Sequence, residues 1–381
     1  MNRIITAVIV SLVIAGCAGG LRGKSNLVQP TELNSTIPSN LVVKGWEVKT
    51  GSQTPKESNL RFLIADDGVG TLYVAGQKGI VTAIDMSSGS KVWEHKVGSQ
   101  LYTGVGYSQG VLLVGRQDAY VEALSANGGE SMWSKKVLGV PAVPPVGNGN
   151  LAIVRTLFGA VETFDLQTGE DRWAYIFNNS ELSVRGAAPP TFMGADVLVA
   201  SDEGTLALID AKTGAQKWST VLSEPLNGSF MGGLRDVDAA MIVTDDRIFV
   251  GQYLSGITAL NHHGRKLWQK GKGTYAGLVF TGDAVVSVER DSTIQALNAQ
   301  DGSPVWDNRD LRGRNLTKPV LVGNRIVVGD YQGYVHVLDA STGALQGSTK
   351  IGSNGFLLDI KEINGNIYLL DYSGTLYKVS I

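Results

Sequence analysis

Short stretches rich in β-branched and alternating apolar residues recur along most of the chain. One copy contains residues 72–75 and 81–85, and the next contains residues 111–114 and 121–124. The remaining copies begin at Leu151, Val197, Ile248, Ala284, Ile326 and Ile367, which makes eight in all. Since no helix-period segment separates these stretches, the pattern predicts strands joined by Gly and Asp/Asn turns.

Tryptophans mark the length of the repeat. Six of them, Trp93, Trp133, Trp173, Trp218, Trp268 and Trp306, follow one another at intervals of 40, 40, 45, 50 and 38 residues. A period of about 40 residues with four strands per unit is typical of a propeller blade. Several copies place an Asp and a Gly before the Trp, as in Asp85, Gly89 and Trp93. We expect the Asp and Gly to shape the last turn of a blade and the Trp to pack on its neighbour rather than to form a ligand cage.

The two ends of the chain complement each other. The eighth copy ends at Ile381, two strands after it begins, so it lacks an outer strand. Residues 43–49 have the composition of the outer strand at residues 91–97, each with a central Trp-Glu pair. We therefore predict an all-β fold, an eight-bladed β-propeller whose ring is closed by the N-terminal strand. Closure removes sheet edges that would otherwise pair with other chains.

Composition and charge narrow the class of partner. A repeat array can accommodate 381 residues in one domain, because each unit contacts only its neighbours. The net charge is −2, with 33 Lys and Arg against 35 Asp and Glu. No basic field is available to attract a phosphate backbone, so nucleic acid is not an expected partner.

The N-terminus has the features of an export signal. Arg3 precedes an apolar run at residues 4–14, which is too short to span a bilayer, and Ala15-Gly16-Cys17 follows. Cys17 is the single cysteine of the chain, and its context resembles the lipobox of bacterial lipoproteins, in which the thiol is acylated. This resemblance implies a signal peptide at residues 1–16, a lipidated flexible tether at 17–40 and a propeller at 41–381. Ala18 follows the cysteine where such lipoproteins have an Asp if they are retained in the inner membrane, so the resemblance implies the outer membrane. The alternative is an ordinary signal peptide that is cleaved at a nearby small residue, in which case Cys17 has no role in lipidation.

Two neighbouring connections are longer than usual; the segment from Trp46 to Leu72, at 26 residues, is long as well and is left unassigned. The distance from a Trp to the next recurring strand is usually 16 to 20 residues, but it is 24 after Trp173 and 30 after Trp218. We place the extra residues at 178–187 and 223–237, on one rim of the ring. Their apolar residues are flanked by Arg and Asp, which is typical of a protein interface. Two interpretations stay open: the segments bind a partner, or they pack on each other with Arg185 paired to Asp236 or Asp238.

The motifs of these segments carry a family resemblance. The lipobox, the Trp-anchored blades, the LSVRG sequence at 182–186 and the DVD sequence at 236–238 resemble the BamB family, the propeller lipoproteins of the outer-membrane β-barrel assembly machinery. The blade pattern alone is shared with quinoprotein dehydrogenases. The resemblance implies a lipid-anchored scaffold on the periplasmic face of the outer membrane, which binds the periplasmic domains of the central barrel subunit and assists insertion of β-barrel proteins. The residues it assigns to partner binding are Leu182, Val184, Arg185, Asp236 and Asp238.

Three alternatives are less consistent with the sequence. A quinone-dependent dehydrogenase usually has adjacent cysteines and a Ca²⁺ site, and neither a second Cys nor a carboxylate cluster is present. His95, His262, His263 and His336 lack metal-ligand spacing, and no Gly-x-Ser-x-Gly motif occurs. We therefore expect no catalytic residue, metal or cofactor. A carrier that offers sheet edges to unfolded outer-membrane proteins is a second alternative, and an unrelated envelope scaffold is a third.

Overall fold

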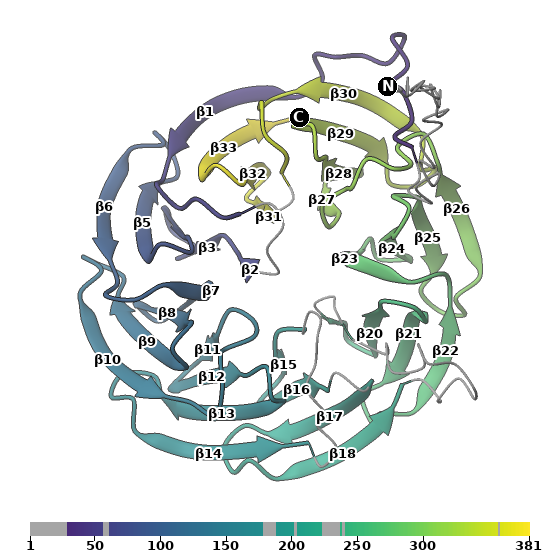
Figure 1. Cartoon of the computed structure of the whole chain (residues 1–381). Helices are drawn as coiled ribbons and strands as arrows, with labels where there is room; N and C mark the ends of the chain where they lie inside the picture. The colour runs from purple at the N-terminus through teal and green to yellow at the C-terminus, as the bar shows by residue number, and fades with distance from the viewer. Residues whose placement is uncertain are drawn as a thin grey trace, which may run out of the picture.

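A closed ring of eight antiparallel sheets forms the molecule (Figure 1). The computed structural model describes residues 29–55, 61–177, 188–201, 204–222, 237, 241–356 and 359–381. No helix occurs among these residues, and hence none that could cross a membrane. The all-β, eight-bladed propeller predicted from the repeat is confirmed.

The first four blades follow the chain from the centre of the ring outward, with one extra strand in blade 2. Blade 1 comprises β3 (Ala65–Asp66), β4 (Thr71–Ala75), β5 (Ile80–Asp85) and β6 (Lys91–Lys96). Blade 2 comprises β7 (Leu101–Ser108), β8 (Val111–Arg116), β9 (Tyr120–Ser125) and β10 (Ser131–Lys136), with β2 (Arg61–Phe62) beside β7. Blade 3 comprises β11 (Val146–Asn148), β12 (Leu151–Arg155), β13 (Ala160–Asp165) and β14 (Asp171–Ile176). Blade 4 comprises β15 (Thr191–Met193), β16 (Asp196–Ala200), β17 (Thr205–Asp210) and β18 (Gln216–Val221).

The last four blades repeat this order until the chain ends meet. Blade 5 comprises β19 (Ile242–Val243), β20 (Arg247–Gln252), β21 (Gly256–Asn261) and β22 (Lys266–Lys270). Blade 6 comprises β23 (Thr274–Phe280), β24 (Ala284–Glu289), β25 (Ile294–Asn298) and β26 (Pro304–Asn308). Blade 7 comprises β27 (Val320–Val322), β28 (Arg325–Gly329), β29 (Tyr334–Asp339) and β30 (Leu345–Lys350). Blade 8 comprises β31 (Asp359–Ile363), β32 (Asn366–Leu370), β33 (Thr375–Ser380) and β1 (Val43–Lys49).

The N-terminal strand closes the ring, as predicted. β1 pairs antiparallel with β33, from Val43 opposite Ser380 to Lys49 opposite Thr375. The register shifts between Lys44 and Trp46, so the outer strand carries a bulge just before its tryptophan. The four strands of blade 8 therefore come from both ends of the chain.

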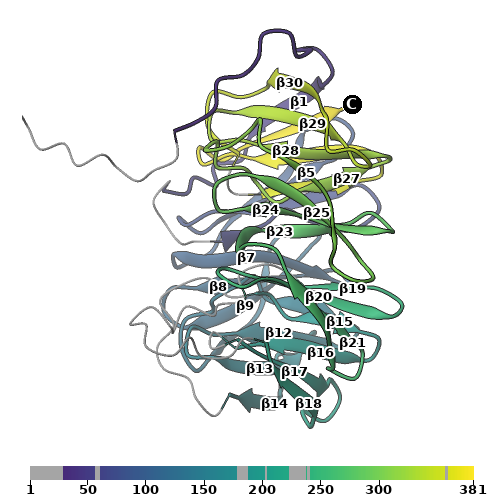
Figure 2. The same ribbon diagram turned by 90° about the vertical axis from the view of Figure 1, so that its right-hand side faces the viewer.

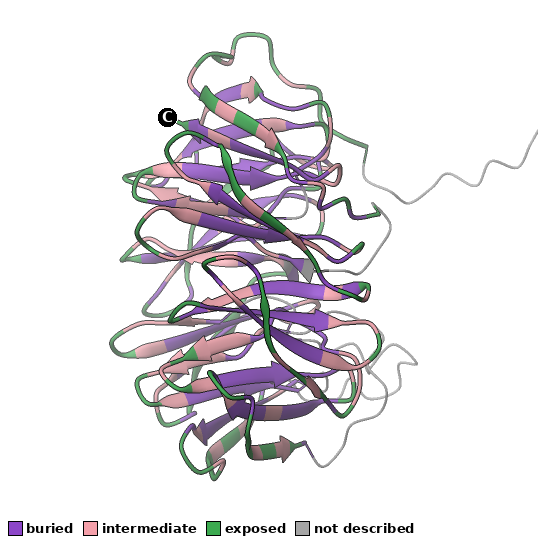
Figure 3. Ribbon diagram, turned by 90° about the vertical axis from the view of Figure 1, so that its left-hand side faces the viewer, coloured by how far each residue is buried: buried purple, intermediate pink, exposed green. Residues whose placement is uncertain are grey.

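Buried apolar side chains lie between the blades. The second and third strands of each blade are buried along most of their length, whereas the outer strands alternate between exposed and half-buried residues, as in β6. Figure 3 shows this distribution, with buried residues through the body of the ring and exposed residues at its turns. A strand buried on both faces can be apolar throughout, which explains the continuous apolar runs of the sequence.

Each tryptophan of an outer strand joins two blades, and Trp133 is typical. Its indole Nε1 donates to the carbonyl oxygen of Leu166 in the next blade at 2.9 Å. Its ring lies against Gly169, where a Cβ atom would come within 2.7 Å of Cδ2, and Gly169 has a φ of +71°. Glycine is therefore required both for the turn and for the close approach of the ring. The packing interpretation of the tryptophans is confirmed.

The aspartates of the repeat hold the same turns. Asp165 Oδ1 accepts the N–H groups of Gln167 and Thr168, and Asp165 Oδ2 accepts Nη2 of Arg172 at 2.6 Å. These hydrogen bonds, with that from Arg172 the largest, lower the pKa of Asp165 to about 2. The carboxylate is therefore ionised at neutral pH, where it accepts these hydrogen bonds.

Gly347 stands where seven outer strands have a tryptophan, and residues before β1 fill the space. A Cβ atom on Gly347 would come within 2.8 Å of the Cβ of Leu41. We call residues 31–42 the N-terminal strap. Pro38 of the strap accepts the N–H of Ser348 on β30 at 2.9 Å, and Thr31 donates its N–H to the carbonyl oxygen of Arg312 at 2.9 Å. The strap thus covers the outer edge of blade 7, where it runs beside β30 in Figures 1 and 2.

Residues 29–40 belong to the segment that the sequence analysis assigns to the tether, and this described part contacts blade 7. Residues 1–28, including Cys17, lie outside the described residues. The division of the chain at residues 16 and 40 stays a prediction.

The long segment between Trp46 and Leu72 reaches the centre of the ring. Its strand β2 runs parallel to β7, with Phe62 opposite Gly104, and Phe62 is fully buried. The N–H of Ile64 donates to Oδ2 of Asp359 at 2.8 Å, which links this segment to blade 8. The repeat pattern did not indicate this strand, because no other blade has an equivalent.

Candidate functional site

One face of the ring carries all connections between blades. Because successive strands alternate in direction, the outer strand of each blade ends on the face where the next inner strand begins. The turn between the second and third strands of each blade lies on this face too. We call it the connection face. The two enlarged segments, between β14 and β15 and between β18 and β19, therefore share it.

The residues predicted to bind a partner cannot be placed. Leu182, Val184, Arg185, Asp236 and Asp238 lie outside the described residues. Their role as a docking surface stays a prediction, and so does the alternative of an internal Arg185 ion pair.

Four described residues in or next to the two enlarged connections are buried in the core. Ala188 follows the first connection and is 1% exposed, while Leu222 precedes the second and is 0% exposed. Val237, the centre of the Asp-Val-Asp motif, and Met241 are buried at 2% and 5%. These four residues belong to one hydrophobic cluster between blades 4 and 5. The re-entry point of the first connection and the described residues of the second thus share one apolar cluster, whereas Phe177, before the first connection, packs in the cluster between blades 3 and 4.

Four exposed large apolar side chains belong to blades 3 and 4 or to the connection before blade 3. Ile176 and Val221 are the last residues of β14 and β18, directly before the enlarged connections, and they are 53% and 46% exposed. Leu138 precedes blade 3, and Phe158 lies in the turn between β12 and β13; they are 55% and 52% exposed. Exposed large apolar residues next to the enlarged connections make this part of the ring a candidate interaction site.

Phe158 is held in place by its neighbours. Its ring lies over Gly139, where a Cβ atom would come within 2.2 Å of Cδ2. The N–H of Leu138 donates to Oε1 of Glu162 at 2.7 Å, which fixes the same connection. Burial and the nearby Asp171 raise the pKa of Glu162 above its ordinary value, although the Leu138 N–H opposes this. Leu138 and Phe158 are thus presented side by side on a braced turn.

Comparison of the blades could have identified Phe158 from the sequence. It immediately precedes Gly159, the residue of positive φ in the turn between the second and third strands. The residues at this position in the other seven blades are all polar: Lys78, Asp118, Glu203, Ser255, Asp291, Gln332 and Ser373. A single aromatic residue at an otherwise polar turn position is a signal that the count of loop lengths missed.

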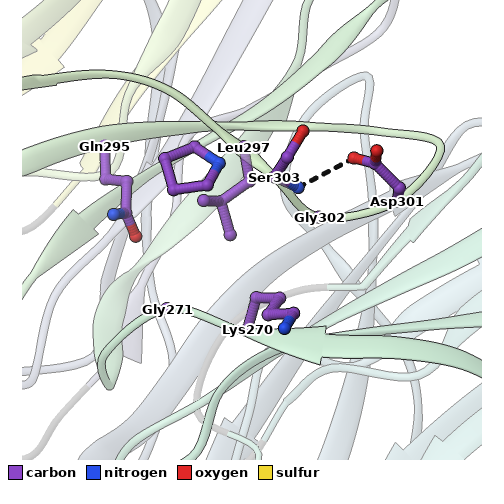
Figure 4. Close-up of a pocket in the computed structure, with 8 residues that line it drawn as sticks. Lys270, Gly271, Gln295, Leu297, Asp301, Gly302 and Ser303 are labelled. Atoms are coloured by element: carbon purple, nitrogen blue, oxygen red, sulfur yellow. Dashed lines mark hydrogen bonds between the residues drawn. The ribbon is translucent and has the colours of Figure 1, made fainter.

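A separate pocket of about 430 Å³ lies on the outer wall between blades 5 and 6 (Figure 4). Lys270, Gln295, Leu297 and Asp301 line it, and Asp301 accepts the N–H of Ser303 at 2.8 Å. None of its residues belongs to the two enlarged connections. Within the part of the chain that the structure describes, no group of three or more His, Cys, Asp or Glu side chains is placed to hold a metal ion.

The fold defines the class of protein as a closed eight-bladed β-propeller. A family model described as "Outer membrane protein assembly factor BamB" matches residues 77–308 and 280–366. The chain belongs to the BamB family. The outer membrane protein assembly factor BamB of Burkholderia pseudomallei is 31% identical over 376 residues, which cover 96% of this chain and 94% of that protein.

Solved structures agree with this assignment. The crystal structure of BamB from Moraxella catarrhalis has a TM-score of 0.79 and 25% identity, and the match covers 89% of this chain and all of that one. The quinohemoprotein alcohol dehydrogenase of Comamonas testosteroni has a TM-score of 0.66 at 14% identity, over 89% of this chain and 76% of that one. The second likeness shows the fold alone, so the propeller by itself does not separate scaffold from enzyme.

Proposed function

We propose that this chain is a non-enzymatic scaffold lipoprotein of the outer-membrane protein assembly machinery, held at the periplasmic face of the outer membrane by a lipid on Cys17. Membership of a family whose relatives are named assembly factors supports the role in assembly. The alternative of a dehydrogenase has support from fold likeness only.

The partner that we propose is the set of periplasmic domains of the central barrel subunit. These domains dock on the connection face of blades 2 to 4, where Leu182, Val184, Arg185, Asp236 and Asp238 make the specific contacts. The observation that supports this most directly is the exposure of four apolar residues, Leu138, Phe158, Ile176 and Val221, of which the last two directly precede the enlarged connections. An apolar centre with charged residues beside it is the composition expected of a protein interface.

The test measures the affinity of the full chain for the purified periplasmic domains. Phe158→Ser, which restores the polar character of the other blades at this turn, should weaken binding by a factor of ten or more, since loss of an aromatic anchor costs about 2 kcal/mol. Arg185→Ala and charge reversal at Asp236 and Asp238 should have effects of similar size. Thermal stability should stay unchanged in each case, because Phe158 is 52% exposed and the role proposed for the three charged residues is in docking rather than in folding.

Val92→Ser is the matched control. Val92 is 58% exposed, about as much as Phe158, but it lies on the outer wall of blade 1. This variant should bind with unchanged affinity. Equal affinity of wild type, Phe158→Ser and Arg185→Ala would exclude the connection face as the docking site, and binding of an unfolded outer-membrane protein instead would favour the carrier alternative.

A further inference from the structure

Side chains of neighbouring outer strands bond to each other across the junctions between blades. At two junctions, the residue two places after one tryptophan contacts the residue two places before the next tryptophan. Lys135 Nζ lies 3.4 Å from Asp171 Oδ2, and the hydroxyl of Tyr175 donates to Oε1 of Gln216 at 2.6 Å. At the junction between blades 5 and 6, the equivalent residues are Lys270 and Pro304. Proline has no side-chain acceptor, so Lys270 lacks the partner that this position provides in blade 3.

The other lysine of β22, Lys266, lacks a partner for a similar reason. In blades 1 and 8, a lysine two places before the tryptophan pairs with a glutamate one place after it. The two pairs are Lys91 with Glu94 at 2.6 Å and Lys44 with Glu47 at 2.8 Å. The residue equivalent to these glutamates in blade 5 is Gln269. Within the part of the chain that the structure describes, neither Lys266 nor Lys270 forms an ion pair.

The pocket on the outer wall lies beside these lysines. Lys270 and Pro304 both line its volume of about 430 Å³, and Figure 4 shows Lys270 across from Gln295. The side chain of Gln295 has no hydrogen-bond partner among the described residues. Asp301 also lines the pocket, but it accepts hydrogen bonds from Ser303, which are the main cause of its lowered pKa, with a smaller contribution from the charge of Lys270. The pocket therefore offers an ammonium group and an amide without hydrogen-bonded partners.

Positive charge is concentrated along this part of the outer wall. Residues 262–272 include no Asp or Glu and four exposed basic residues, Arg265, Lys266, Lys270 and Lys272. Of these four, only Lys272 has an ion pair within the described residues, with Glu289 at 3.4 Å. Charged residues on an outer strand also keep it from pairing with other chains, but the paired lysines of blades 1 and 8 serve that purpose equally well. Because the whole chain has a net charge of −2, these unpaired cations indicate a binding surface for a negatively charged partner.

We propose that β22 and the pocket beside it bind an extended acidic segment of another protein. One carboxylate of the segment enters the pocket, where it pairs with Lys270 and accepts the amide N–H of Gln295. A second carboxylate pairs with Lys266, which lies roughly 13 Å away along the strand. Leu267, which is 38% exposed, and Leu297 in the pocket provide apolar contacts. A recess admits a side chain but not the flat surface of a bilayer, so shape and charge together favour a protein segment over anionic lipid.

The experiment measures binding of a fluorescein-labelled peptide, Glu-Ser-Glu-Leu-Glu-Ser-Glu, to the full chain by fluorescence anisotropy. A peptide with Gln in place of each Glu is the control ligand. The acidic peptide should bind about tenfold or more tightly than this control, and its affinity should fall as salt is added, since the charges are exposed to solvent. Lys270→Glu should weaken binding about tenfold or more, and Lys266→Glu should weaken it less, because Lys266 lies outside the pocket.

Pro304→Asp tests the pocket itself. It gives Lys270 the kind of partner that Asp171 provides to Lys135, so the peptide has to compete with a carboxylate of the same chain. Affinity should fall about tenfold, while the thermal transition stays unchanged or rises. Lys135→Glu is the matched control, because it changes the net charge as Lys270→Glu does, at the equivalent position of a junction where the lysine is already paired. This variant should bind the acidic peptide with unchanged affinity.

Three results would overturn the proposal: an acidic peptide that binds no better than its Gln counterpart, equal affinity of wild type and Lys270→Glu, or equal weakening by Lys135→Glu. Vesicles of phosphatidylglycerol, added as a competitor, should displace no more peptide than vesicles of phosphatidylcholine. Displacement by phosphatidylglycerol alone would assign the surface to an anionic membrane instead. The surface shares no residue with the proposed docking site for the central barrel subunit, so failure of either leaves the other standing.

Discussion

At the scale of single residues, a buried polar group in blade 7 combines three ionisable side chains. His336 and Asp330 are both 0% exposed, and His336 Nε2 lies 3.1 Å from Asp330 Oδ2. A carboxylate only accepts, so His336 Nε2 carries the hydrogen, and Nδ1 accepts from the Ser348 hydroxyl at 2.8 Å. Arg314 pairs with the same carboxylate at 2.6 Å. The group is therefore neutral histidine beside an Asp–Arg ion pair.

Asp330 and His336 both have lowered pKa values, for different reasons. Burial lowers the pKa of His336, and the opposing effect of Asp330 does not restore it. Burial by itself would raise the pKa of Asp330, but the hydrogen bond from His336, the Tyr334 N–H and the charge of Arg314 lower it overall. Asp330 and His336 thus each favour the deprotonated form in the folded chain.

We predict a pH dependence of stability that His336 causes. Below about pH 6.5 the unfolded chain takes up a proton on this residue that the folded chain does not bind, so the free energy of unfolding falls by up to about 1.4 kcal/mol per pH unit. Above that pH the contribution is fully present. His336→Gln should remove this part of the slope, as measured by denaturant unfolding between pH 7.5 and 5.0. His263→Gln, in an exposed turn, is the control, and equal slopes in wild type and His336→Gln would contradict the assignment.

At the scale of elements, the features that could be predicted from the sequence are those that recur from blade to blade. The blades, the Trp133–Gly169 contact and the pairing of β1 with β33 could be predicted, because the same residue types recur at a fixed phase. Strand β2 and the strap could not, since each occurs once and its partners lie far away in the chain, as for Thr31 and Arg312. Lys270 and Phe158 needed a comparison of equivalent positions between blades, because no local motif surrounds them.

The absence of a tryptophan in blade 7 is a consequence of ring closure. A tryptophan at position 347 would reach the place where the outer turn of blade 8 would lie. In that blade the last two strands, β33 and β1, meet at Ser380 and Val43 and are not joined by a turn. The strap passes there, and Val42 donates its N–H to Oγ1 of Thr349 at 3.3 Å. Gly347 and Leu41 therefore form a contact that replaces the Trp–Gly contact of the other junctions.

We predict that Gly347→Ala destabilises the chain by about 1–3 kcal/mol, because the new Cβ would lie 2.8 Å from the Cβ of Leu41 and 2.9 Å from its Cδ2. Gly45→Ala is the control on β1, since a Cβ there would lie 3.5 Å from its nearest neighbour, an ordinary contact. A double-mutant cycle with Leu41→Gly, followed by urea unfolding, checks the assignment. The two changes should be clearly non-additive; additivity would mean that the contact with Leu41 is not the cause.

At the scale of the whole molecule, one pairing decides whether the propeller is a ring or an open array. Trp46 connects β1 to blade 1 through a hydrogen bond from its Nε1 to the carbonyl oxygen of Met86 at 3.3 Å. Its ring also packs 5.9 Å from that of Tyr368 in blade 8. β1 therefore links blade 8 to blade 1, and its pairing with β33 closes the ring inside blade 8, between strands from opposite ends of the chain.

We predict that two truncations, which differ only by β1, behave differently. A chain that begins at residue 43 lacks the strap but keeps β1, so it should stay monomeric with reduced stability. A chain that begins at residue 50 exposes the edge of β33 and loses Trp46, which alone should cost about 3–5 kcal/mol. An unpaired edge recruits other strands, so this chain should form dimers or larger species in light scattering after size exclusion. A synthetic peptide of residues 41–50, added in excess, should restore the monomer by occupying the edge, whereas the same peptide with Trp46→Ala should do so poorly. A stable monomer from residue 50 onward would show that seven blades and three strands hold the ring without help from β1.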